Sequence, residues 1–173
     1  MKKVYILYTL LIKMGIDYGN ALDWIVNILR KEEISFQATG GLAAKVYGSR
    51  RTLFDIDLEL DNSNIKKLVP FLKRHIIYGP EKYLDDSFNI FLMTLKYRKE
   101  LIDLCGSKNQ RIYDLKSKKW IKLNVDLTKS EKHRVFNLEI PVVPLEDLIF
   151  YKSKIRRKTD LEDISYMKRQ KII

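Results

Sequence analysis

Acidic and apolar residues alternate in the segment FDIDLEL (54–60), and this alternation limits the possible folds of the chain more than any other feature. In a β-strand, residues i and i+2 point to the same face. Asp55 and Asp57 therefore project together, whereas Ile56 and Leu58 project to the opposite face. Such a pattern is often a solvated edge strand. If the strand is buried, as its apolar face indicates, the two carboxylates repel each other unless a cation lies between them.

A third carboxylate occupies a similar setting. Asp103 lies between two apolar residues in ELIDL (100–104), which predicts a central strand. If this strand lies beside that of Asp55 and Asp57, three carboxylates converge. Mg²⁺ prefers such oxygen ligands together with phosphate oxygens. The sequence therefore predicts a two-metal site for phosphoryl or nucleotidyl transfer, with Glu59 as either an outer ligand or a solvated strand end.

A glycine pair precedes the acidic segment. Thirteen residues separate Gly40-Gly41 from Asp55, and the pair lies between an expected strand and an expected short helix. A glycine turn of this kind lets backbone N–H groups approach phosphate oxygens. Arg50 and Arg51 would supply cations for the phosphate charge. Each feature alone is common in turns and on surfaces, but their order and spacing together favour a phosphate site.

The remaining pattern predicts an α/β (α+β) fold, a mixed sheet flanked by helices. We expect one domain over 1–173, with a helical C-terminal part over 144–173. The expected helices are 17–33, 42–47, 62–75, one that begins at Pro144, and 160–169; the expected strands are 34–39, 53–60, 88–97, 99–104 and 134–143, with a hairpin within 111–125 and loops over 78–87 and 105–110.

Composition narrows the class of protein. Hydrophobic residues make up 46% of the 173 residues, which is enough for a core. The single cysteine, Cys105, excludes an intrachain disulfide and fits the reducing cytoplasm. The apolar run 4–12 is far shorter than the ~20 residues that span a bilayer. We therefore expect a cytoplasmic protein with no membrane partner, in which 4–12 forms a buried helix or strand.

The net charge is +11, and most of the excess lies in the C-terminal part. Residues 1–105 carry 16 basic and 13 acidic side chains, whereas residues 106–173 carry 17 and 9. A basic surface attracts polyanions such as nucleic acid, nucleotides or anionic lipid. A lysine-rich composition throughout the proteome would explain the charge equally well.

Together these motifs resemble those of the DNA polymerase β-type nucleotidyltransferase superfamily, whose signature is a glycine pair, a short spacer and Asp-h-Asp/Glu-h. The segment GSRRTLFDID (48–57) is similar to that of small aminoglycoside and lincosamide nucleotidyltransferases and of abortive-infection toxin-like members. The C-terminal segment VVPLEDLIFYKSKIRRKTDLEDI (142–164) resembles the same subgroup.

The resemblance implies roles for individual residues. Asp55 and Asp57 would bind two Mg²⁺ ions, and Asp103 would be the third acid. The triphosphate of an NTP would lie against the nucleotide-binding residues Gly40, Gly41, Ser49, Arg50, Arg51 and Lys152. Lys152 could instead be structural. Asp160 and Asp163 are more simply explained as acids that cap a helix and balance its dipole.

The leading hypothesis is a metal-dependent nucleotidyltransferase that moves an NMP from an NTP to a hydroxyl acceptor and releases pyrophosphate. The acceptor would be a small molecule, a protein or an RNA. Because the chain has no large extra domain, a homodimer or a helical partner protein would complete the cleft. Two alternatives remain: a non-catalytic binding module, such as a toxin–antitoxin component, and a basic nucleic-acid-binding domain.

Overall fold

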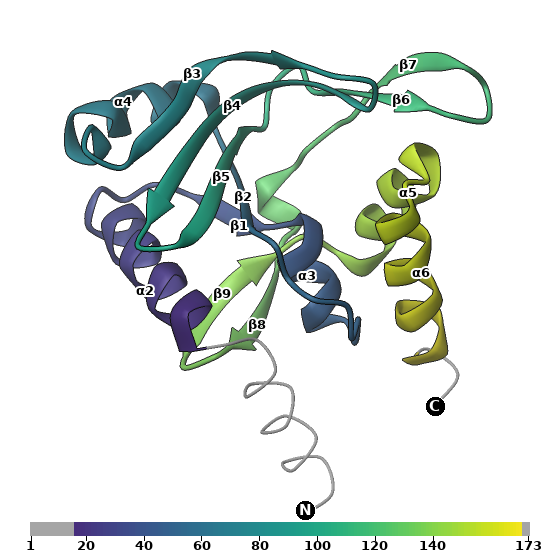
Figure 1. The fold of residues 1–173 in the computed structure, drawn as a ribbon, viewed down its shortest axis with the longest axis horizontal. Coiled ribbons are helices and arrows are strands. Elements are labelled where there is room, and N and C mark those ends of the chain that lie inside the picture. Colours follow the sequence, from purple (N-terminus) through teal and green to yellow (C-terminus); the bar gives the residue numbers. More distant parts are fainter. Residues whose placement is uncertain (1–15, 171–173) are drawn as a thin grey trace, which may run out of the picture.

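The structure, a computed structural model, describes residues 16–170, which form a mixed β-sheet with helices packed against it (Figure 1). The expected α/β fold with a mixed sheet is therefore confirmed. The elements are α2 (Ile16–Lys31), β1 (Phe36–Ala38), α3 (Gly40–Val46), β2 (Ile56–Leu60), α4 (Asn62–Leu72), β3 (Ile76–Leu84), β4 (Phe88–Tyr97), β5 (Glu100–Gly106), β6 (Arg111–Asp114), β7 (Lys119–Lys122), the 3₁₀ turn η1 (Leu127–Lys129), β8 (Glu131–Val135), β9 (Leu138–Val142), α5 (Leu145–Ile155) and α6 (Lys158–Gln170).

The strands follow the order β7-β6-β4-β5-β2-β1-β9-β8 across the sheet, and β3 pairs with β4 outside this path. Most neighbouring strands are antiparallel, but β1 and β9 run parallel, and so do β2 and β5 at the centre of the sheet. Their register places Asp57 opposite Asp103. The central parallel pair therefore brings the two acidic segments of the sequence side by side, as expected.

Apolar side chains at helical or alternating spacing form the core. One face of α2 is buried through Ala21, Leu22, Ile25 and Leu29, which recur every three or four residues. In β2, Ile56, Leu58 and Leu60 are fully buried, and so are Ile102 and Leu104 of β5. Because side chains alternate along a strand, Asp57 and Asp103 project away from these apolar positions, on the other face of the sheet.

The helices divide between two regions of the molecule. Helices α2 and α4 contact β5, whereas α3 contacts β2 and the C-terminal helices α5 and α6. Figure 1 shows α5 and α6 on the opposite side of the molecule from α2 and α4. Within residues 16–170, no helix is both long enough and apolar enough to cross a membrane. The predicted element at 4–12 lies outside the described residues.

Two predicted elements were wrong, and a third begins earlier than expected. The expected loop 78–87 is mostly strand, because β3 continues past Gly79 and Pro80 through shifts in its register with β4. The expected single strand 134–143 is the β8–β9 hairpin, which turns at Phe136 with a left-handed φ of 54°. The glycine pair does not precede its helix but forms the first two residues of α3.

Candidate active site

Three carboxylates meet on the face of the β2–β5 pair that points away from the core. Asp57 and Asp103 are register partners, and Asp55 directly precedes β2. One oxygen from each of the three lies within 4.8 Å of the others. The convergence that the sequence analysis required for a metal site is therefore present among the described residues.

Crowding and burial disturb the ionisation of all three acids. Burial, followed by the charges of Asp57 and Asp103, raises the pKa of Asp55 to about 7. Burial also raises the pKa of Asp103, although a 2.7 Å hydrogen bond from the Thr94 hydroxyl opposes it, to about 6. Burial likewise raises the pKa of Asp57, against the effect of the Gly41 N–H. The cluster therefore holds more negative charge than the protein neutralises by itself.

The chemistry of this donor set fits a divalent metal ion. Three carboxylates offer hard oxygen ligands, the type that Mg²⁺ takes. Asp55 is only partly buried and lines the cleft, so its carboxylate is accessible to an ion. A bound cation would offset the burial and the charges of Asp57 and Asp103 that raise the pKa of Asp55.

Gly40 is required by the acidic cluster itself. Its φ is +58°, and an added Cβ would lie 1.8 Å from Oδ2 of Asp57. The next N–H, that of Gly41, donates to the same oxygen at 3.2 Å. The glycine pair thus lies directly against Asp57 and fixes its carboxylate. It borders the cleft in which a triphosphate would have to lie.

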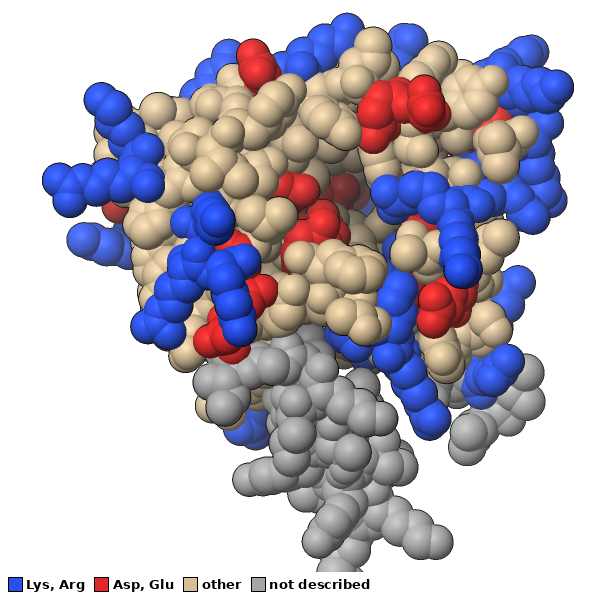
Figure 2. Space-filling model, viewed as in Figure 1, with Lys and Arg blue, Asp and Glu red and all other residues tan. Residues whose placement is uncertain are grey.

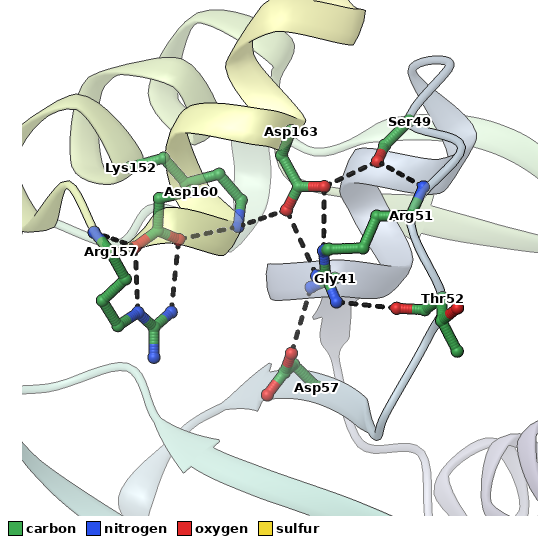
Figure 3. A network of polar contacts seen from close by, with 9 residues as sticks. All are labelled: Gly41, Ser49, Arg51, Thr52, Asp57, Lys152, Arg157, Asp160 and Asp163. Carbon is green, nitrogen blue, oxygen red and sulfur yellow. Dashed lines mark hydrogen bonds and ion pairs between the residues drawn. The ribbon is translucent and has the colours of Figure 1, made fainter.

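Lys152 lies at the centre of a buried ion network beside the cluster (Figure 3). Its Nζ is 3.1 Å from Oδ1 of Asp160 and 3.0 Å from Oδ2 of Asp163, and both aspartates are fully buried. Burial alone would lower the pKa of Lys152, but Tyr151, Asp160 and Asp163 outweigh it and raise the pKa. Lys152 is therefore charged, and it also lines the cleft.

Asp163 joins this network to the segment that follows α3. It accepts hydrogen bonds from the Ser49 hydroxyl at 2.6 Å and from Arg51 through Nε at 3.1 Å and Nη2 at 3.2 Å (Figure 3). Burial acts to raise the pKa of Asp163, but the hydrogen bond from Arg51 and the charge of Lys152 hold it below its usual range. The acid thus fixes α6 against residues 49–51.

The predicted nucleotide-binding residues therefore have different surroundings. Gly40, Gly41, Arg51 and Lys152 all line the cleft. Ser49 is fully buried and bonded to Asp163, and Arg50 is exposed and does not line the cleft. Asp160 does act at the N-terminus of α6, where it accepts from the Arg157 N–H at 3.0 Å, but it also binds Lys152.

Arg157 is a cleft residue that the sequence analysis did not identify. Its Nε and Nη2 donate to the two oxygens of Asp160 at 2.9 and 3.2 Å, and its guanidinium lies 4.9 Å from the centre of the Phe88 ring. Its side chain is about half exposed and borders the acidic cluster. The sequence RRK (156–158) gave one signal, a run of cations just before an acidic helix.

Glu59 is neither a solvated strand end nor an evident metal ligand. It is buried, and its two oxygens accept from Nε2 of Gln37 at 2.7 Å and Nε2 of Gln110 at 3.2 Å. Burial raises its pKa, and both hydrogen bonds oppose that change. These contacts connect β1, β2 and the segment after β5 beneath the cleft.

The cleft above these residues has a volume of about 440 Å³. Figure 2 shows acidic side chains inside a hollow at the middle of the molecule and basic side chains beside it. Besides the three aspartates, the lining includes the cations Arg51, Lys152 and Arg157 on one side and the aromatic residues Tyr78, Tyr83 and Phe88 on another. Carboxylates beside fixed cations can bind a metal–phosphate substrate.

This architecture is the nucleotidyltransferase fold. In sequence, neither a protein-family profile nor a curated protein matches the chain. A candidate nucleotidyltransferase from Thermotoga maritima has a similar structure, with a TM-score of 0.66 at 20% identity over 86% of this chain and 91% of its own.

Two further solved structures are similar at lower identity. One is the lincosamide antibiotic adenylyltransferase LnuA with bound lincomycin, with a TM-score of 0.57 at 18% identity over 85% of this chain and 94% of its own. The other is ANT(2″)-Ia with adenylyl-2″-tobramycin, with a TM-score of 0.55 at 12% identity over 88% and 92%. The expected resemblance is confirmed at the level of the fold.

Proposed function

We propose that this chain is a metal-dependent nucleotidyltransferase that moves an NMP from an NTP to a hydroxyl acceptor and releases pyrophosphate. The observation that carries this proposal is the convergence of Asp55, Asp57 and Asp103 within 4.8 Å, beside three fixed cations in one cleft. A structural role alone does not explain the arrangement, because three crowded carboxylates destabilise a fold that gains nothing from them.

The acidic residues of the cleft would bind metal ions, and the basic residues would bind phosphate oxygens. Mg²⁺ bound by the three aspartates would neutralise charge on the phosphates and on the attacking hydroxyl. Arg157, half exposed at the cleft, is placed to bind phosphate oxygens, and the network of Lys152 and Arg51 supplies further positive charge behind it. The oxygen of the acceptor forms a bond to the α-phosphorus, and the bond from that phosphorus to pyrophosphate breaks.

Asp103 is the best placed of the three acids to take the proton of the acceptor hydroxyl. It belongs to β5, beside the cleft wall that Tyr83 and Phe88 contribute, and a carboxylate there could accept a proton as a general base. The Thr94 hydroxyl donates to one of its oxygens at 2.7 Å and fixes the orientation of the carboxylate.

The test is label transfer from each α-labelled NTP, with Mg²⁺, to panels of small-molecule and RNA acceptors. Small hydroxyl compounds belong in the panel because two fold neighbours are described with lincomycin and with adenylylated tobramycin. Asp57→Asn should abolish transfer, whereas Asp23→Asn, which changes an exposed acid of α2 in the same way, should leave it unchanged.

The outcomes separate the proposal from the non-catalytic alternative. Loss of transfer in Asp57→Asn alone supports an enzyme. Transfer that persists in Asp57→Asn would refute the proposed site. A wild-type protein that binds Mg²⁺–NTP but transfers nothing to any acceptor would instead favour a binding module of nucleotidyltransferase fold.

A further inference from the structure

One face of the β6–β7 hairpin carries aromatic and basic side chains in matched pairs. Tyr113 is the register partner of Trp120, and Arg111 is the partner of Lys122. Because side chains alternate, these four residues share one face, and the buried Ile112 lies on the other. The two rings lie 5.5 Å apart in an edge-to-face arrangement, and Trp120 is 37% exposed. An aromatic pair is thus displayed beside two cations.

The hairpin is fixed to the C-terminal helices. The Leu115 N–H donates to the Lys154 carbonyl at 3.0 Å, and Nζ of Lys154 lies 3.3 Å from Oδ2 of Asp114. These contacts come from the hairpin turn and from α5, just before Arg156 and Arg157. The aromatic face therefore has a defined position relative to the cations at the α5–α6 junction.

A groove of about 810 Å³ runs between the hairpin and that junction. It is lined by Tyr113, Trp120, Arg156 and Arg157 together with the exposed Leu84 and Leu115. Asp85 and Arg157 also line the cleft of the three aspartates, so the groove and the cleft meet there. A molecule lying in the groove could reach the acidic cluster without leaving the surface.

Charge distinguishes the candidates for an occupant. Figure 2 shows Lys and Arg gathered at the right-hand edge, where Figure 1 places β6 and β7. Two acids, Asp85 and Asp86, also line the groove, at the end of β3. Asp85 already accepts from the N–H groups of Ser87 and Phe88 at 2.8 and 2.7 Å, so part of its charge is compensated. The wall formed by the hairpin and the junction remains basic.

We propose that this groove and the adjoining face of the β6–β7 hairpin bind single-stranded nucleic acid. Bases would stack on Trp120 and Tyr113, and phosphates would be bound by Arg156 in the groove and by Arg111 and Lys122 on the hairpin face beside it. Stacking rings interleaved with cations are the features that hold a single strand without requiring a particular sequence. An acidic protein segment would also meet the cations, but it would not use the exposed ring faces.

The strand would enter the cleft by its free end, an extension that rests on the proposed function. A terminal ribose hydroxyl is then the acceptor. Its oxygen bonds to the α-phosphorus of the NTP, its proton is released to solvent, and pyrophosphate leaves with the bonding electrons of the broken P–O bond. The product is a strand longer by one nucleotide.

The direct test is fluorescence anisotropy with a short labelled single-stranded RNA and its DNA counterpart, titrated at several salt concentrations. Trp120→Ala should weaken binding by about 5- to 100-fold, and Trp120→Phe, which keeps a ring, should retain most of the affinity. Arg111→Ala/Lys122→Ala should lower the slope of log K against log salt by about 1.4, because two phosphate contacts are lost. The two labelled strands distinguish RNA from DNA as the ligand.

Lys67→Ala/Lys73→Ala is the matched control, because it removes two exposed charges of the α4 region, away from the hairpin. Equal affinity of all variants, or an equal loss in this control, would overturn the proposal. So would self-association through Trp120 without oligonucleotide binding, which would indicate a protein interface.

The two proposals fail in different ways. Asp57→Asn should still bind the labelled strand while it loses transfer. If the wild type binds the strand but transfers no nucleotide to any acceptor, the proposed enzymatic activity is refuted and the proposed strand-binding groove is retained. If the wild type transfers a nucleotide to a small molecule but binds no strand, strand binding by the groove is refuted and the proposed enzymatic activity is retained.

Discussion

Replacing Lys152 by methionine should lower the free energy of unfolding by about 3 kcal/mol. Removing one partner of a buried ion pair typically costs about 3–5 kcal/mol, because the other charge stays buried without compensation. Here the substitution leaves two fully buried carboxylates, Asp160 and Asp163. Each keeps an arginine, Arg157 for the first and Arg51 for the second, so we expect the lower end of that range.

Urea unfolding followed by circular dichroism measures this loss as a lower midpoint with an unchanged slope. For a chain of this size, about 3 kcal/mol corresponds to a fall in Tm of about 6–12 °C. Lys99→Met is the control, because it removes the exposed Lys99–Asp17 ion pair and should leave the urea midpoint almost unchanged.

A second substitution tests the cause of the loss. Adding Asp160→Asn to Lys152→Met removes one uncompensated carboxylate and should recover part of the stability. A Lys152→Met protein within about 1 kcal/mol of the wild type would refute the reasoning, because the aspartates would then not depend on this cation. A loss as large in Lys99→Met would refute it as well.

Three further predictions follow from the site. Gly40→Ala should lower the free energy of unfolding by about 2 kcal/mol or more, because Gly40 has a positive φ and its added Cβ would clash with Asp57. Gly19→Ala in α2, whose Cβ would meet the Phe136 ring at 3.4 Å, should instead raise it by about 0.5–1 kcal/mol. Urea midpoints that fail to separate the two variants would contradict this reasoning. The pKa of Asp55 is 3.8 in the unfolded chain and about 7 in the metal-free folded protein. Between these pH values the folded state binds more protons than the unfolded state, so the metal-free protein loses stability as the pH rises from about 4 to about 7. Mg²⁺ should therefore raise Tm more at pH 8 than at pH 5, and a thermal-shift series without this trend would argue against metal binding there. Thr94→Val removes the hydrogen bond that lowers the pKa of Asp103, so the acidic limb of the pH–rate profile for transfer should move to higher pH, and an unmoved limb would show that Asp103 is not the base.

The sequence was most informative where a short pattern carried its own geometry. Alternation in DIDLEL implied that Asp55 and Asp57 share a face, and the apolar neighbours of Asp103 implied a central strand. Both expectations required only local chemistry. That β2 and β5 lie side by side was a supposition from strand order, and the register of Asp57 opposite Asp103 agrees with it.

The ion network could not be predicted in the same way. Local sequence explains Asp160 as a helix-capping acid, and it does cap α6. Its second partner, Lys152, depends on how α6 packs against α5, and the contact of Asp163 with Ser49 depends on how α6 packs against the segment after α3. No local pattern specifies either packing. The loop expected over 78–87 failed for a related reason, since pairing with β4 overrides the turn tendency of Gly79-Pro80.

The parallel pairing of β2 with β5 also bears on how the protein acquires its site during synthesis. Helix α4 and strands β3 and β4 separate the two acidic strands along the chain, so the carboxylates meet only after a long crossover has closed. Two of the cations that line the cleft, Lys152 of α5 and Arg157 just before α6, are made after both acidic strands. A nascent chain would therefore gather its negative charges before these positive ones, and its central strands would remain under electrostatic repulsion until the C-terminal helices dock.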